Sequence, residues 1–163
     1  MKLSRKAKRY DDSVLAGDFQ GFEPFQDGDP LSQEAVVSGA LRRQGRVVEV
    51  EHLAAEGLGA RKQSFAKLRS KAETFLHQVT YLRERLEIVD HDRRGMFIQL
   101  RSLPPYKDDH RIEFNEICIG KDRVVVKRIA FNRKDEVKRQ IPLAMAEEDL
   151  HRLLRDLRQV FRA

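Results

Sequence analysis

The clearest hydrophobic pattern lies between residues 60 and 86. Apolar side chains recur there at alternating steps of three and four, at Phe65, Leu68, Ala72, Phe75, Val79, Leu82 and Leu86. Heptad spacing of this kind predicts one long helix over residues 60–86 with an apolar stripe along one side. Two interpretations of the stripe stay open. It is the seam of a coiled-coil homodimer, through Phe65, Leu68, Phe75, Val79 and Leu82, or it packs on the protein's own sheet.

The hydrophobic period changes from helical to strand-like at Leu86. Apolar and polar positions alternate, with turn-forming residues in between, in the segments 86–92, 96–102, 110–120, 123–132 and 137–143. Alternation predicts antiparallel strands. Within 111–119 and 123–133 the apolar positions skip by three instead of two, from Phe114 to Ile117 and from Val126 to Ile129. A strand keeps period two unless an extra residue bulges out, so we expect a bulge in each strand and a strongly curved sheet.

The chain closes on an amphipathic helix predicted at 146–161. Leucines at 150, 153, 154 and 157 share one side, and the acids Glu147, Glu148 and Asp149 occupy the first turn, where they suit the helix dipole. The predicted fold is therefore α+β: a long helix, a curved and bulged antiparallel sheet of four to five strands at 86–143, and this C-terminal helix.

The N-terminal third lacks a sustained period. Residues 1–30 are polar and broken by Gly and Pro, which predicts a disordered or extended arm. Residues 31–59 are predicted to be a connector with a short helix at 31–44 and a short strand around 48–51, which leaves 60–163 as the α+β domain. Three aromatic residues of the arm are spaced by three: Phe19, Phe22 and Phe25. They pack on the protein's own body or dimer partner, or they form a linear motif that docks on another protein.

Charge adds a candidate surface. The formal net charge is +6, and basic residues gather on the last two strands and the turn between them, at Arg123, Lys127, Arg128, Arg133, Lys138 and Arg139. Long cationic side chains on a sheet suit phosphate contacts, and Phe97 and Tyr106 are candidates for base stacking. The competing interpretation is that these cations keep the strands soluble and pair with Glu113 and Glu116. If they are exposed, replacing Lys127 and Arg128 by Ala should leave thermal stability almost unchanged.

Catalytic and metal-binding chemistry finds no support in the residues. The five histidines lack partners at metal-ligand spacing, and no nucleophile–base arrangement can be argued. We expect neither an enzyme nor a cofactor. Cys118 is the only cysteine, which favours a reducing compartment, and we expect a cytoplasmic protein. No apolar run is long enough for a membrane helix, so no membrane association is expected.

The C-terminal half resembles a known family. The stretch "GKDRVVVKRIAFNRKDEVKRQIPLAMAEEDLHRLLRDLRQVF", with an apolar-to-acidic junction from Leu143 to Glu147 and Glu148, is similar to the end of a PUR-type domain. Whirly-type domains share this plan, and the resemblance covers about residues 95–163. It implies single-stranded DNA or RNA bound on the sheet, and a homodimer. A pleckstrin-homology-like sheet with a C-terminal helix would give a similar string and would bind protein or lipid.

The leading hypothesis is accordingly a small, non-enzymatic, single-stranded nucleic-acid-binding protein. The alternative is an interaction or scaffold protein. It would assemble through the 65–86 stripe and would meet a protein partner through the Phe19, Phe22 and Phe25 motif of the arm.

Overall fold

The computed structural model describes residues 14–32, 34–57 and 63–162. The first part of the predicted arm, residues 1–13, lies outside the described residues. The sheet contains β1 (Val14–Leu15), β2 (Glu23–Asp27), β3 (Val36–Gln44), β4 (Val47–Glu56), β5 (Leu86–Asp92), β6 (Phe97–Ser102), β7 (Tyr106–Lys107), β8 (Arg111–Gly120), β9 (Arg123–Asn132), β10 (Val137–Ile141) and β11 (Leu143–Ala146). The described helices are α2 (Phe65–Gln78) and α3 (Glu147–Gln159).

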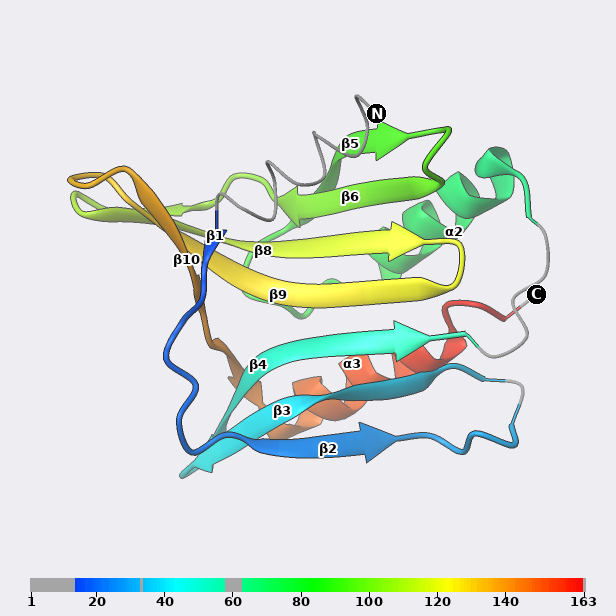
Figure 1. The fold of residues 1–163 in the computed structure, drawn as a ribbon, viewed down its shortest axis with the longest axis horizontal. Helices are drawn as coiled ribbons and strands as arrows, with labels where there is room; N and C mark the ends of the chain where they lie inside the picture. The colour runs from blue at the N-terminus through cyan, green and yellow to red at the C-terminus, as the bar shows by residue number, and fades with distance from the viewer. Residues whose placement is uncertain (1–13, 33, 58–62, 163) are drawn as a thin grey trace.

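One antiparallel sheet runs through both halves of the chain in the order β2-β3-β4-β9-β8-β6-β5. β10 and β11 are separated only by Pro142; β10 pairs with β9, whereas β11 crosses to β4. β1 pairs parallel with β10, and β7 pairs with β8. Both helices lie behind this sheet in the view of Figure 1, so they cover the same face.

Each helix covers strands from the other half of the chain. α2 follows β4 in sequence but contacts β6 and β8, whereas α3, at the end of the chain, contacts β3, β4 and β11. The core between the helices and the sheet is completed by Leu68, Ala72 and Phe75 of α2 and by Leu150, Leu153 and Leu157 of α3. Neither half therefore buries its apolar surface alone, and the two halves form one folding unit.

The predicted long helix at 60–86 is wrong. α2 begins at Phe65, where Ser64 accepts a capping hydrogen bond from the Lys67 amide, and ends at Gln78. Val79 has φ −89° and ψ 73°, which leaves the helical region. The apolar stripe nevertheless continues, because Val79, Leu82 and Leu86 enter the same core from non-helical backbone.

The N-terminal third also differs from its prediction. The short helix expected at 31–44 is instead β3, whose partner β4 includes the strand expected around 48–51. Within the expected arm, β1 pairs with β10 and β2 pairs with β3, so two short parts of the arm belong to the sheet. The predicted α+β layout, with a sheet only after residue 86, is therefore corrected to a mainly antiparallel sheet that starts in the first thirty residues.

β5, β6, β8, β9 and β10 lie where alternation predicts strands, whereas β7 and β11 were not predicted and the predicted bulges are absent from β8 and β9. β8 pairs with β9 without a register shift from Arg111↔Asn132 to Ile119↔Val124. Shifts occur instead in β3–β4, at Ala40/Leu41, and in β5–β6, between Ile88 and Asp90. The skipped apolar positions in β8 and β9 mark a change of buried face along regular strands.

Candidate functional site

The six predicted phosphate-binding cations do not share one surface. Side chains alternate along a strand, and residues directly opposite in a ladder point to the same side. The regular β8–β9–β10 register therefore puts Arg123, Lys127 and Lys138 on the face away from the helices and Arg128 and Arg139 on the helix-bearing face. Arg133 lies in the β9–β10 turn.

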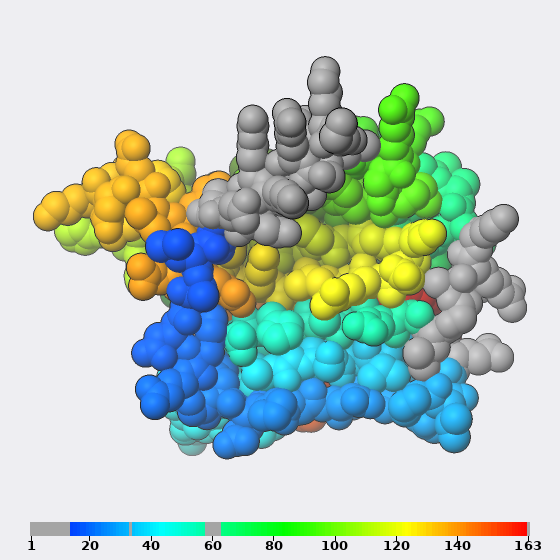
Figure 2. Space-filling view, in the orientation of Figure 1, coloured from blue at the N-terminus to red at the C-terminus, as the bar shows by residue number. Residues whose placement is uncertain are grey.

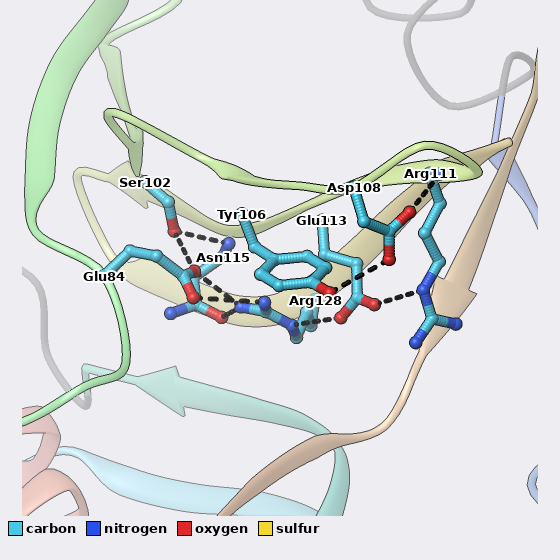
Figure 3. Close-up of polar contacts among 8 residues, drawn as sticks. All are labelled: Glu84, Ser102, Tyr106, Asp108, Arg111, Glu113, Asn115 and Arg128. Atoms are coloured by element: carbon cyan, nitrogen blue, oxygen red, sulfur yellow. Dashed lines mark hydrogen bonds and ion pairs between the residues drawn. The ribbon is translucent and has the colours of Figure 1, made fainter. Parts of the chain in front are cut away.

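Arg128 is buried, so the prediction that it contacts phosphates is wrong. Its residue exposure is 3%. Nη1 donates to Glu84 Oε1 (2.8 Å) and to Asn115 Oδ1 (2.7 Å), Nη2 donates to Glu84 Oε2 (3.2 Å), and Nε donates to Glu113 Oε1 (3.2 Å). Figure 3 shows these groups converging on the guanidinium. The Arg128 side chain is therefore hydrogen-bonded inside the protein and does not reach the surface.

The hydrogen bonds around Arg128 tie the segment after α2 to the sheet. Ser102 Oγ donates to Glu84 Oε1 (3.0 Å) and accepts from the Asn115 amide (2.7 Å). Arg111 Nε lies 2.6 Å from the second oxygen of Glu113. Two glutamates and two arginines balance in charge, which is how a buried ionic cluster avoids an uncompensated charge. This arrangement indicates a structural role for the predicted cation at 128.

On the face away from the helices, Lys127 and Arg123 each lie near a carboxylate. Lys127 Nζ lies 3.9 Å from Glu116 Oε1, and Arg123 Nε lies 4.0 Å from Glu56 Oε1. The pairings of Arg128 with Glu113 and of Lys127 with Glu116 are those of the competing interpretation, in which strand cations serve the fold. No continuous cationic face is therefore formed by the six residues.

A smaller group of exposed cations surrounds Tyr106 at the free end of β8 and β9. We call Arg83, Tyr106, Arg111, Arg133 and Arg139 the tip patch. Tyr106 pairs with Glu113, Glu113 with Ala130, and Ala130 with Arg139, which makes one row on the helix-bearing face. The Arg133 amide donates to the His110 carbonyl (2.9 Å), which joins the β9–β10 turn to the β7–β8 turn. The orange β9–β10 turn projects beyond the body in Figure 2.

Tyr106 presents an aromatic surface within the tip patch. It is 37% exposed, and the Arg83 guanidinium lies 5.9 Å from its ring centre. Its hydroxyl donates to Asp108 Oδ2 (2.9 Å), which fixes the ring by its polar end. Asp109, Asp135 and Glu136 are exposed in the same two turns, so the potential of the tip is mixed rather than uniformly positive.

Asp108 organises the β7–β8 turn. Its Oδ1 accepts the amides of His110 and Arg111, both at 2.8 Å. These two bonds and the bond from Tyr106 favour the charged carboxylate and lower the pKa of Asp108 to about 2. The same bond to Asp108 raises the pKa of Tyr106, so the phenol remains a hydrogen-bond donor.

The stripe and the Phe motif, predicted as partner surfaces, pack within the chain. Leu68, Phe75, Val79 and Leu82 are buried in the core, and Phe65 packs against it. A seam made of these residues is excluded while the fold is intact. Phe25 also packs on the core, and Phe19 and Phe22 meet edge to face at 5.3 Å, with Arg42 over the Phe22 ring at 4.8 Å.

The sequence pattern did not identify Arg83, Arg111 or the half-buried acid Glu84. Arg111 opens a predicted strand, but its neighbours are set by long-range register, which a local pattern does not contain. Arg83 and Glu84 fall within the predicted helix at 60–86 but off its apolar stripe, so the hydrophobic pattern does not place them. Phe97, the other stacking candidate, is half-buried on β6.

The described ranges contain no group of three or more His, Cys, Asp or Glu side chains suited to a metal ion. Over those same ranges, no helix has the length and apolar character needed to cross a bilayer. Comparison of the chain with known protein families, with curated proteins and with solved structures finds no match.

Proposed function

We propose that the protein binds single-stranded DNA or RNA at the tip patch, without catalysis. The observation that carries the proposal is the exposed Tyr106 ring, with the Arg83 guanidinium 5.9 Å from its centre and Arg111 and Arg139 on the same face of the sheet. Sequence-tolerant single-strand binding combines aromatic stacking with cations that follow the phosphate backbone. The ring offers a stacking surface, and the cations come from the segment between α2 and β5 (Arg83), from β8 (Arg111) and from β10 (Arg139).

The patch retains Arg133 and Arg139 from the six cations predicted at first and replaces the rest. Arg128 is unsuited because its side chain is 4% exposed and pairs with two glutamates. Arg111, whose side chain is 54% exposed, keeps donors for a phosphate while one nitrogen pairs with Glu113. Overall charge of +6 supports attraction of a polyanion.

An interaction or scaffold role has weaker support. Its two surfaces were the 65–86 stripe and the Phe motif, and both pack inside this chain. We therefore propose no dimer through the stripe. A cytoplasmic location stays part of the proposal and rests on the single cysteine.

A titration of labelled single-stranded DNA and RNA at two salt concentrations tests the proposed function. The double variant Arg133→Ala/Arg139→Ala should weaken binding and flatten the slope of log affinity against log salt by about 1.4, twice the 0.7 expected per phosphate contact. Lys121→Ala/Arg123→Ala is the matched control, since it removes the same charge from exposed residues at the other end of the β8–β9 hairpin. Equal effects of the two variants would reject the tip patch as the binding surface.

A further inference from the structure

A cleft lies between α2 and α3, next to the core, since its lining includes the buried Phe75 of α2. Its volume is about 230 Å³, which equals the liquid volume of roughly seven or eight waters. Ser70, Lys71, Thr74 and Gln78 line it from α2, and Gln159 and Arg162 line it from the end of α3. Phe75 and Val160 supply its apolar floor.

The cleft is rich in hydrogen-bond donors that the fold does not use. Lys71 forms no ion pair with any described residue, and its ammonium lies 5.9 Å from the Phe161 ring centre. The side-chain amides of Gln78 and Gln159 make no hydrogen bond within the described ranges. Arg162 Nη2 lies 3.3 Å from Glu34 Oε1, and the other guanidinium N–H groups remain as donors.

Asp156, the carboxylate among the lining residues, already interacts with two neighbouring side chains. Asp156 Oδ2 accepts the Tyr81 hydroxyl (2.7 Å), and its other oxygen lies 4.0 Å from Arg155 Nε. It therefore repels an anion less than a free carboxylate would. Burial, and to a smaller extent the neighbouring Lys67, lower the pKa of Lys71, and an anion bound beside the ammonium would favour its charged form.

We propose that the cleft between α2 and α3 binds a small phosphate ester, with the oxyanion on Lys71 and Arg162 and the remaining polar atoms on the two glutamines. A phosphate accepts several hydrogen bonds at once, which matches two cations flanked by neutral donors. The cleft is too small for most drug-sized ligands, which occupy about 300–1,000 Å³, and this size favours a compact metabolite. The site is separate from the tip patch and does not rest on nucleic-acid binding.

Amide NMR titration of the full chain with glycerol 3-phosphate tests this site, with glycerol as the neutral probe. We expect saturable shifts at the amides of residues 70–78 and 159–162, and none with glycerol. Lys71→Gln should weaken binding at least tenfold. Lys67→Gln, on the same helix but outside the cleft, should change it less than threefold.

Arg162→Gln is a second variant, because Lys71→Gln also removes the ammonium from above the Phe161 ring, just after α3. It should also weaken binding at least tenfold with an unchanged unfolding midpoint. Three results would overturn the proposal: no saturable binding, equal losses in the Lys67 and Lys71 variants, or shifts with glycerol as large as with the ester. Tighter binding of a 5′-phosphorylated oligonucleotide in the cleft would overturn the assignment to a small ester.

Discussion

Replacing Arg128 by Ala should strongly destabilise the protein, which reverses the expectation from sequence that this position tolerates change. The side chain is 4% exposed and donates four hydrogen bonds, to Glu84, Glu113 and Asn115. Alanine would leave two carboxylates without their cation, 11% and 8% exposed respectively. Removing one partner of a buried ion pair costs about 3–5 kcal/mol.

Urea unfolding followed by far-ultraviolet circular dichroism measures this loss. In a thermal melt, the melting temperature should fall by roughly 6–20 °C, because a chain of this size loses about 2–4 °C per kcal/mol. Arg123→Ala on the same strand, with its exposed guanidinium, should change stability by no more than about 0.5 kcal/mol. Arg128→Met combined with Gln at positions 84 and 113 should recover part of the loss, because it removes the stranded charges. A loss below about 1 kcal/mol for Arg128→Ala would refute the buried network.

Two further substitutions probe the local geometry. Asp108→Asn should bring the pKa of Tyr106 back towards its ordinary value, as measured by the phenol absorbance, whereas Asp109→Asn should leave it unchanged. An equal response in both variants would contradict the hydrogen bond between Tyr106 and Asp108. Folding lowers the pKa of Asp108 from 3.8 to about 2, so the stability it contributes is present above pH 3.8 and is lost as the pH falls towards 2. Asp108→Asn should therefore lose least against wild type at the acid end of that window, as measured by urea unfolding at several pH values. Ala146 is the N-cap of α3, with φ −72° and ψ 155°, and provides no side-chain cap. Ala146→Ser should stabilise the chain by about 0.5–2 kcal/mol, whereas Ala144→Ser should not. A neutral result for Ala146→Ser would mean that the Ser hydroxyl does not reach the first-turn amides.

Local hydrophobic patterns predicted where the strands lie but not which elements pack on each of their faces. Alternation located β8 and β9 because apolar side chains recur at period two on either side of one skipped step in each strand. It could not show that the buried side changes near Lys127, since the cover on each face comes from elements far away in sequence. The Arg128 misassignment follows directly, because a polar residue at a buried position looks like a bulge when only the spacing of its apolar neighbours is read.

The heptad stripe shows a related limit. Spacing identified which residues enter the core, and Val79, Leu82 and Leu86 are all buried. It did not identify the backbone that carries them there, because turns and a strand can deliver the same side chains after α2 ends. β3 was missed for a similar reason: Gly39 and the register shift at Ala40/Leu41 break its alternation. A Cβ at Gly39 would lie 2.1 Å from the His52 carbonyl oxygen, so the glycine permits the close approach of β4.

The tip patch was only partly predictable. Composition drew attention to the basic turn with Arg133 and to Tyr106 as a stacking candidate. Their grouping with Arg111 and Arg139 depends on the pairing of four strands, β7 to β10. That pairing is a tertiary property, which no spacing within one strand encodes.

Amide chemical-shift mapping with a short single-stranded oligonucleotide tests the proposed function most directly. The account predicts shifts concentrated at residues 106–111 and 130–139, and their loss in Tyr106→Ala, whose binding should weaken by about 1–3 kcal/mol. Shifts spread across β3, β4 and the middle of β9 on the face away from the helices, with the tip unaffected, would contradict it.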